Sequence, residues 1–270
     1  MPLRRSIHRE ILNENPSALR LVTIHGAMDR GNSFRQLASL LPSVEVVIWD
    51  RAGYARSIEV APAGVDDHLA DLAGVLDEKP ALVFGHSLGG TYALWLASLG
   101  HPHLLGVSTF ESPLPGGAWW GDDWDIDPHE AALGRVPKER SQALAEAFLR
   151  RMISDATWER LPERTKALRR AEGSAFILEL GQLVDGGVTF DLDSIKVDVV
   201  AGISSRPSRH HRVGLAKLVD SVQATTYCVM NSRHGVHLTN PAAIAEIVSQ
   251  QLLVDEGEEA RKTTLQKTTL

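Results

Sequence analysis

Hydrophobic residues are gathered in six short runs along the chain. None of these runs alternates cleanly between apolar and polar positions, which is typical of strands covered on both faces. Segments with helical spacing of apolar residues lie between them, for example 34–41 and 66–76. Strands that alternate with helices predict an α/β protein with a mostly parallel sheet. The predicted strands are 19–26, 44–50, 81–87, 104–112, 197–205 and 224–232.

The alternation is interrupted in the middle of the chain. Residues 113–128 are rich in Pro, Gly, Trp and Asp, which favour a loop. Apolar residues then recur at spacings of three and four between about 137 and 183, as in Leu144, Phe148 and Met152. The final polar stretch offers little surface to bury. We therefore predict a core of residues 1–112 and 191–255, a helical cap of residues 113–190, and a disordered tail of residues 256–270.

Composition fits one globular domain with an inserted subdomain. The chain has 270 residues, of which 43% are hydrophobic and 23% are charged, and this is ample to bury a core. A net charge of −6 offers no basic surface for nucleic acid or for an anionic membrane. We expect neither as a partner, and the oligomeric state is left open.

Cysteine content and the N-terminal segment bear on location. Cys228 is the single cysteine, so an internal disulfide is excluded and a reducing compartment is favoured. Because it falls in a predicted strand, we expect it to be buried. The N-terminal residues contain no apolar segment typical of a secretory signal, and no run has the length of a transmembrane helix. The expectation is a cytoplasmic protein.

The most informative motif is Gly85-His86-Ser87-Leu88-Gly89, which fits G-x-S-x-G between a predicted strand and a predicted helix. A nucleophile on such a tight turn has a strained backbone, and glycines two residues to either side leave room for it. The following helix N-terminus directs N–H groups at negative charge forming near the hydroxyl. The alternative is that Ser87 simply caps the helix.

Three further segments occur in an order that, with this motif, resembles the α/β-hydrolase superfamily. "TIHGAMDRGNSF" (23–34) resembles the strand ending in His-Gly that leads into the oxyanion loop. "WDRAGYARS" (49–57) is similar to the D-x-R-G-x-G-x-S loop, with its arginine shifted and Ala55 at the second glycine. "NSRHGVHLTNP" (231–241) resembles the late segment with the catalytic histidine, from which Ser232 and Arg233 depart.

The resemblance implies roles for individual residues. Ser87 would be the nucleophile and His234 the general base and later the acid. The backbone N–H groups of Ala27 and Leu88 would form the oxyanion hole. His237 is a rival to His234 as the base, and it has the alternatives of lining the pocket or capping the next helix. His25 and His86 are expected to be structural.

The triad acid is missing from its usual place. No Asp or Glu follows the predicted strand 197–205 until Asp220, which lies late in a predicted helix. Glu111 ends the strand after the Ser87 motif, where some members of the superfamily, such as the haloalkane dehalogenases, have their acid. It also preserves the order Ser, acid, His. Alternatives are a local pairing of Glu111, a Ser–His dyad, or Asp220 as the acid.

Other candidate groups favour ordinary structural roles. The pair His210-His211 is interpreted as part of a solvated basic loop, since no further metal ligands lie nearby. An aspartate cluster lacks the glycine and terminal glutamate of an EF-hand loop, so we expect a solvated acidic loop. It comprises Asp122, Asp123, Asp125 and Asp127. We expect no metal and no cofactor.

A group of aromatic residues suggests the pocket. Trp119, Trp120 and Trp124 lie near the predicted cap entrance, where aromatic side chains line apolar pockets or pack cap against core. Met28 and His237 complete the expected pocket. The predicted function is a serine hydrolase that cleaves a small, apolar or aromatic ester through an acyl-enzyme. The alternatives are an acyltransferase or lyase using the same site, or a non-catalytic ligand-binding receptor.

Overall fold

Seven strands form one sheet in the order β1-β3-β2-β4-β5-β6-β7. The computed structural model describes residues 5–61, 64–114, 126–185, 189–222 and 224–252. β1 pairs antiparallel with β3, and every other neighbouring pair is parallel. The strands are β1 (Arg9–Leu12), β2 (Arg20–Ile24), β3 (Glu45–Trp49), β4 (Ala81–His86), β5 (Leu104–Phe110), β6 (Asp198–Ser204) and β7 (Thr225–Val229). The predicted mostly parallel α/β fold is confirmed.

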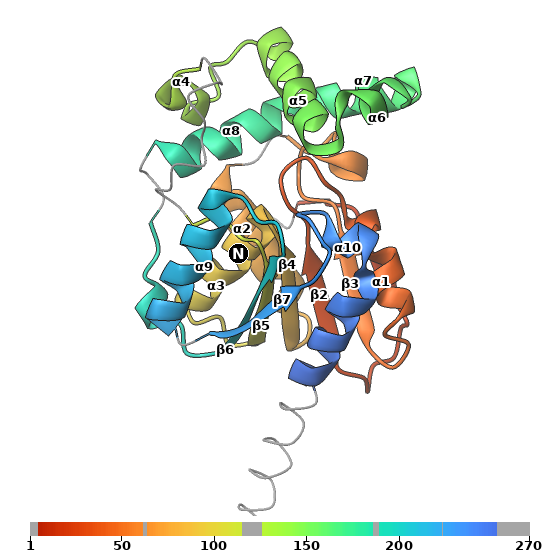
Figure 1. The fold of residues 1–270 in the computed structure, drawn as a ribbon, viewed down its shortest axis with the longest axis vertical. Coiled ribbons are helices and arrows are strands. Elements are labelled where there is room, and N and C mark those ends of the chain that lie inside the picture. Colours follow the sequence, from red (N-terminus) through yellow and green to blue (C-terminus); the bar gives the residue numbers. More distant parts are fainter. Residues whose placement is uncertain (1–4, 62–63, 115–125, 186–188, 223, 253–270) are drawn as a thin grey trace, which may run out of the picture.

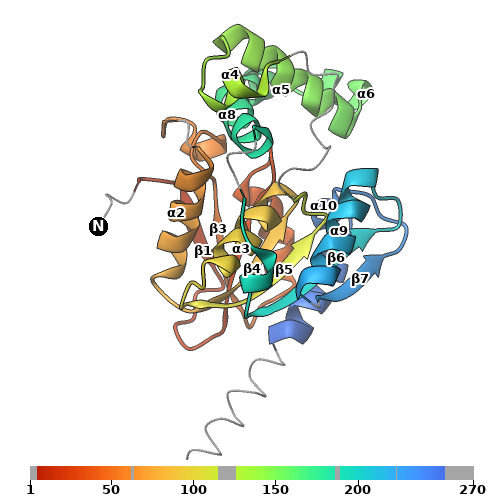
Figure 2. The same cartoon turned by 90° about the vertical axis from the view of Figure 1, so that its left-hand side faces the viewer.

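Helices cover both faces of the sheet (Figures 1 and 2). One face is covered by α2 (Val65–Leu76), α3 (Leu88–Ser98) and α9 (Arg209–Val222). The other is covered by α1 (Arg35–Ser39), α10 (Val236–Thr239) and the helix formed by residues 241–252. Short 3-10 turns are η1 (Gly31–Phe34), η2 (Ala55–Ser57) and η4 (Leu192–Ser194). None of the helices within the described ranges combines the length and apolar character that crossing a bilayer needs.

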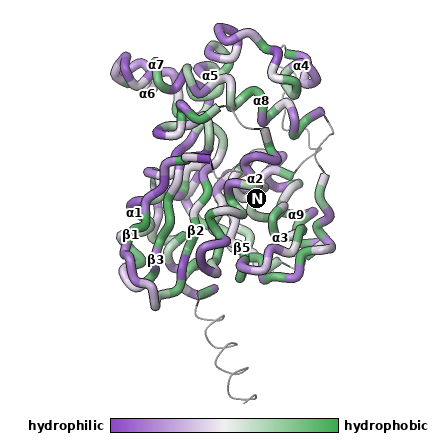
Figure 3. Tube along the Cα trace, turned by 180° about the vertical axis from the view of Figure 1, so that it is seen from behind, coloured by the Kyte–Doolittle hydropathy of each residue, from purple (hydrophilic) through white to green (hydrophobic). Residues whose placement is uncertain are grey.

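Successive strand residues enter two separate hydrophobic cores. Val22 and Val83 belong to the core under α2 and α3, whereas Leu21 and Leu82 belong to the core under α1 and the C-terminal helix. Because side chains of a strand alternate between faces, both faces of the central strands must be apolar. This explains the unbroken hydrophobic runs in the sequence, and Figure 3 shows the hydrophobic residues concentrated along the strands.

The two edge strands differ from the sequence expectation. β1 was not predicted, because it is only four residues long and none of its residues is fully buried. Cys228 lies in β7 as predicted, but it is exposed, so the expectation of a buried core cysteine is wrong. β7 is the last strand of the sheet and most of its residues are accessible, because no further strand pairs along its outer edge.

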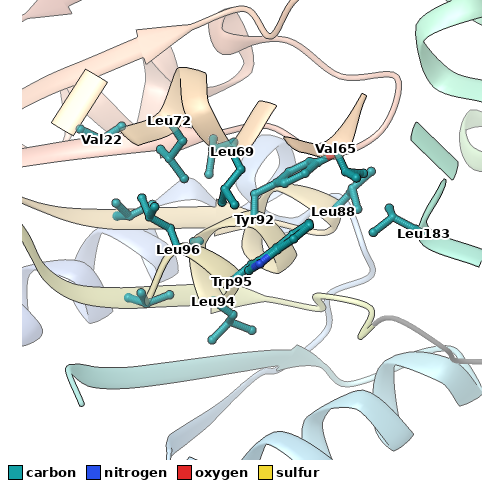
Figure 4. Packing of buried hydrophobic residues seen from close by; sticks show 14 of the residues in the cluster. Val22, Val65, Leu69, Leu72, Leu88, Tyr92, Leu94, Trp95, Leu96 and Leu183 are labelled. Carbon is teal, nitrogen blue, oxygen red and sulfur yellow. The ribbon is translucent and has the colours of Figure 1, made fainter. Parts of the chain in front are cut away.

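Between β5 and β6, the described residues form five α-helices that lie above the carboxyl ends of the strands (Figure 1). They are α4 (Pro128–Ala132), α5 (Lys138–Ile153), α6 (Asp155–Glu159), α7 (Glu163–Ala171) and α8 (Gly173–Val184). Figure 4 shows Leu183 of α8 beside Val65 and Leu88 of the core helices. The exact cap boundaries stay a prediction, since residues 115–125 and 186–188 lie outside the described residues, as does the predicted tail.

A buried ion pair joins α8 to the loop after β3. The Arg51 guanidinium donates to both carboxylate oxygens of Glu179, and both side chains are fully buried. The hydroxyls of Tyr54 and Tyr92 donate to the same carboxylate. Burial by itself would lower the pKa of Arg51, but the Glu179 carboxylate raises the pKa above its ordinary value. Arg51 therefore stays charged, and its pairing with Glu179 joins α8 to the core.

We predict that Glu179→Gln lowers the free energy of unfolding by about 3–5 kcal/mol, because it leaves the Arg51 charge buried without a counterion. Urea unfolding followed by circular dichroism measures this loss. Glu146→Gln, which removes a partly exposed carboxylate paired with Arg150 and Arg170 on the cap, is the matched control. We expect it to cost under about 1 kcal/mol. Equal losses in the two variants would contradict the role given to the buried pair.

Candidate active site

Ser87 lies at the turn between β4 and α3 and has the backbone angles φ 52° and ψ −128°. This conformation is strained for a residue with a side chain. A Cβ at Gly85 would lie 2.4 Å from the Gly90 Cα, and a Cβ at Gly89 would lie 2.1 Å from the Ile24 carbonyl oxygen. The flanking glycines are therefore required by the close approach of the backbone, as the motif predicted.

Ser87 faces a cavity of about 770 Å³ between the sheet and the cap. From the core, Ala27, Met28, Leu88 and His237 line it, so these four predicted site residues are brought together with Ser87. The cap side is largely apolar. It contributes Phe148, Leu149, Met152, Ile153, Phe176 and Leu180. The predicted pocket residues Trp119 and Trp120, and the neighbouring Trp124, lie outside the described residues.

Glu111 and His234 form a hydrogen-bonded pair at the edge of this cavity. The Nδ1 of His234 donates to the Oε2 of Glu111 over 2.7 Å, although 123 positions separate the two residues. Glu111 Oε1 accepts from the Ser204 backbone N–H and hydroxyl at the end of β6, over 3.0 and 2.5 Å. Burial opposes ionisation of Glu111, but the hydrogen bonds from His234 and Ser204 hold its pKa at about 2.

The Ser87 hydroxyl and the His234 ring line the same cavity. Within the described part of the chain, no hydrogen bond joins them. The turn that contains Ser87 and the loop that contains His234 are nevertheless in contact, because the His86 Nε2 donates to the His234 backbone carbonyl over 2.7 Å. Nucleophile–base hydrogen bonds are often long in unliganded enzymes and shorten when substrate binds.

His211 is a site residue that the sequence interpretation missed. Instead of lying in a solvated loop, it is only 8% exposed and its ring stacks on that of His234, with centroids 4.6 Å apart. Its Nδ1 lies 3.3 Å from Glu111 Oε2. Burial, together with the neighbouring His234 and His210, lowers the pKa of His211 to about 3, so its ring is neutral near pH 7. The expectation failed because α9 begins at residue 209 and directs this side chain inward.

A second carboxylate–imidazole pair lines the same cavity. The Nε2 of His237 donates to the Oδ2 of Asp29 over 3.0 Å. The rings of His237 and His86 are 3.9 Å apart, and burial lowers the pKa of His86 well below its ordinary value. His237 therefore joins α10 to the loop after β2, whereas it is His234 that pairs with Glu111.

His25 and His86 have the structural surroundings that the sequence indicated. The His25 Nδ1 donates to the Gly26 carbonyl over 2.8 Å, and its Nε2 accepts from the Arg51 backbone N–H over 3.0 Å. Burial and the nearby Arg51 charge lower the pKa of His25 to about 3, so both contacts involve a neutral ring. The ring of His86 stacks on Phe110.

Backbone strain is concentrated in this region. Met28, Ser87 and Glu111 all line the cavity, and all three have positive φ, between 49° and 55°. A non-glycine residue in this region costs about 1–3 kcal/mol, which the surrounding structure must offset. The strain directs three side chains from three neighbouring strand ends toward one space.

The remaining sequence candidates lie elsewhere. Asp220, the alternative acid, is exposed near the end of α9 and does not line the cavity. Asp127 caps α4, since its carboxylate accepts from the His129 N–H over 2.9 Å. The other three aspartates of that cluster are outside the described residues. In the part of the chain that the structure describes, two groups of side chains bring possible metal ligands within 4.8 Å of one another. They are Asp29, His86 and His237, and Glu111, His211 and His234.

The arrangement can carry out acid–base chemistry next to a hydroxyl. A carboxylate that remains ionised fixes the orientation of His234 and stabilises a positive charge on its ring. Backbone N–H groups at the start of α3 have no partner within the helix and face the region of Ser87. Hydrophobic cap residues exclude water and strengthen electrostatic interactions inside the cavity.

Known proteins resemble this chain over different lengths. A family model described as "Alpha/beta hydrolase family" matches residues 21–247. Lipase LipV of Mycobacterium tuberculosis is 38% identical over 82 residues, which cover 29% of this chain and 31% of that protein. A 2-succinyl-6-hydroxy-2,4-cyclohexadiene-1-carboxylate synthase of Enterobacter sp. (strain 638) is 24% identical over 247 residues, covering 86% of this chain and 91% of the relative.

The fold also recurs among solved structures. The enol-lactonase from Burkholderia xenovorans LB400 has a TM-score of 0.70 at 19% identity, covering 92% of this chain and 96% of that chain. At this identity the likeness concerns the fold alone. Together with the family match over most of the sequence, it shows that this chain belongs to the alpha/beta hydrolase family.

Proposed function

We propose that this protein is a serine hydrolase that cleaves esters through a covalent acyl-enzyme. The observation that carries the proposal is the hydrogen bond from His234 to the buried carboxylate of Glu111, at the edge of the cavity that Ser87 faces. An imidazole oriented in this way has its Nε2 available for the serine proton. The proposed nucleophile is Ser87, which has a strained backbone and is flanked by two glycines that the close packing requires.

In the proposed reaction, the Ser87 oxygen attacks the ester carbonyl while His234 accepts the serine proton. The tetrahedral intermediate collapses, and His234 protonates the departing alcohol. Water then attacks the acyl-enzyme, with its proton passing to His234, and the acid leaves as Ser87 regains its proton. Glu111 stays ionised throughout, because its pKa of about 2 lies far below the working pH.

The backbone N–H groups of Ala27 and Leu88 are the proposed oxyanion donors. Both residues line the cavity on either side of Ser87, and Leu88 is the first residue of α3. Removing a single such donor costs about 2.7–4 kcal/mol in other enzymes. A partial match to a protein named as a lipase, and a fold shared with a lactonase, support an ester as the substrate class.

Elimination or acyl transfer at the same site is the second candidate. It is favoured by the match to the synthase along most of both chains. In a lyase of this kind Ser87 and His234 would remove a proton without forming an acyl-enzyme. A lyase therefore differs from the hydrolase in that no acyl group becomes attached to Ser87, whereas an acyltransferase forms the acyl-enzyme and passes the acyl group to an acceptor other than water.

We predict that a fluorophosphonate probe labels Ser87 in the folded protein, because an activated serine attacks phosphorus as it attacks a carbonyl. Mass spectrometry of the digested protein locates the label. Ser87→Ala should abolish labelling, and Ser39→Ala, at an exposed serine of α1, should leave it intact. Absence of labelling in the folded protein would favour a ligand-binding receptor instead.

Glu111→Gln should lower kcat/KM for a 4-nitrophenyl ester by roughly 10²- to 10⁴-fold, because a neutral amide no longer stabilises the imidazolium. Thermal melting checks that the variant is folded. Asp220→Asn removes the competing carboxylate and should leave the rate within about twofold, as expected for an exposed site. A loss in Asp220→Asn, with Glu111→Gln at the wild-type rate, would transfer the acid role to Asp220.

Hydrolysis through an acyl-enzyme predicts a burst of 4-nitrophenol close to one per molecule when deacylation is slow. Stopped-flow absorbance with a 4-nitrophenyl ester measures this burst. An added acceptor alcohol should leave the acid as the main product if the enzyme is a hydrolase. A new ester as the main product would identify an acyltransferase, and proton removal without acylation would favour a lyase.

A further inference from the structure

Arginines outnumber carboxylates among the described residues that line the candidate cavity, although the protein is acidic. The whole chain has a net charge of −6. Among the residues that the structure describes, by contrast, four arginines and two carboxylates line the cavity. The arginines are Arg151, Arg169, Arg206 and Arg233. Such local concentration of one sign attracts ligands of the opposite charge.

Both carboxylates of the cavity are already engaged by histidines. Glu111 accepts from His234 over 2.7 Å, and Asp29 accepts from His237 over 3.0 Å. Each is a buried or half-buried group whose pKa is lowered, so each remains ionised next to its own imidazole. Neither carboxylate pairs with any of the four arginines.

The cap arginines differ from those of the core. Arg169 is paired with Glu172 over 2.9 Å. Arg151, near the end of α5, lies over the Phe148 ring with its guanidinium carbon 5.9 Å from the centroid. It lies close enough to His210 to contribute to lowering the pKa of that imidazole, although burial is the larger cause. Arg151 of the cap therefore places a positive charge near the start of α9.

Arg206 and Arg233 are the two arginines of the core. Within the described residues neither forms a hydrogen bond or an ion pair, and both are exposed. Arg206 comes two residues after the end of β6, and Arg233 immediately precedes His234. Both therefore lie at the carboxyl edge of the sheet, within the cavity that contains the reacting groups.

We infer that the cavity binds an ester bearing a carboxylate, and that Arg206 and Arg233 bind this carboxylate. The inference rests on the proposed esterase function, and it replaces the expectation of a neutral apolar or aromatic substrate. The apolar cap side chains Phe148, Met152 and Phe176 would contact the hydrocarbon part of the same molecule. Planar guanidinium groups match the geometry of a carboxylate and bind it through charge-assisted hydrogen bonds.

Two substrates that differ only at the distant carboxyl group test this inference. Mono-4-nitrophenyl adipate has a free carboxylate, and 4-nitrophenyl methyl adipate has a neutral methyl ester in its place. We expect wild-type kcat/KM to favour the free acid by about tenfold or more, as expected for hydrogen bonds to a charged group. Added sodium chloride should reduce this ratio, because the arginines are exposed and salt screens them.

The double variant Arg206→Gln/Arg233→Gln should bring the ratio of the two kcat/KM values close to one. Arg209→Gln is the matched control, because Arg209 is an exposed arginine three residues after Arg206 that does not line the cavity. It should retain the wild-type ratio. A wild-type ratio near one, or a ratio that the double variant leaves unchanged, would overturn the inference.

Binding measurements separate this inference from the proposed function. Calorimetry on Ser87→Ala compares monomethyl adipate with dimethyl adipate, and we expect only the monoester to bind measurably. If neither nitrophenyl ester is cleaved but the monoester still binds in an Arg206- and Arg233-dependent manner, the anion site stands and the esterase proposal fails. If the neutral ester is cleaved through Ser87 and the monoester shows no preferential binding, the esterase proposal stands and the anion site fails.

Discussion

The buried carboxylate of Glu111 is the interaction on which the site depends. It accepts hydrogen bonds from Ser204 at the end of β6 and from His234 in the loop after β7, and it lies 3.3 Å from His211 at the start of α9. An ionised carboxylate is costly to bury unless several donors surround it. Because these donors come from two segments far apart in the chain, the carboxylate is satisfied only when both are in place.

The cap is held above this group by a second buried charge. Arg51 and Glu179 connect the loop after β3 to α8, and the hydroxyls of Tyr54 and Tyr92 complete the contacts of the carboxylate. Hydrophobic packing alone would permit small shifts of the cap helices, whereas a buried ion pair with four donated hydrogen bonds restricts the position of α8. Since α8 contributes Phe176 and Leu180 to the cavity, contacts that lie outside the cavity restrict the position of its cap side.

The proposed chemistry and the proposed specificity use different parts of one sheet edge. The central strands supply Ser87 and Glu111, which are buried or half-buried and held by strained backbone. Arg206 and Arg233 belong to the exposed loops after β6 and β7. Parallel strands bring all of these loops to the same edge, so specificity can change in the loops while the reacting groups remain fixed.

Most of the sheet and the position of Ser87 were predictable from the sequence, because a strand buried on both faces and a glycine-flanked turn leave local patterns. Glu111 could be chosen as the candidate acid because it ends a predicted strand and preserves the order Ser, acid, His along the chain. The pairing of His237 with Asp29, the burial of His211, the exposure of Cys228 and the arginines along the cavity were not predictable. These depend on which loops meet at the sheet edge. His234 and Glu111 are 123 positions apart and become neighbours only through the tertiary structure. Local periodicity in the sequence contains no information about a contact between such distant positions.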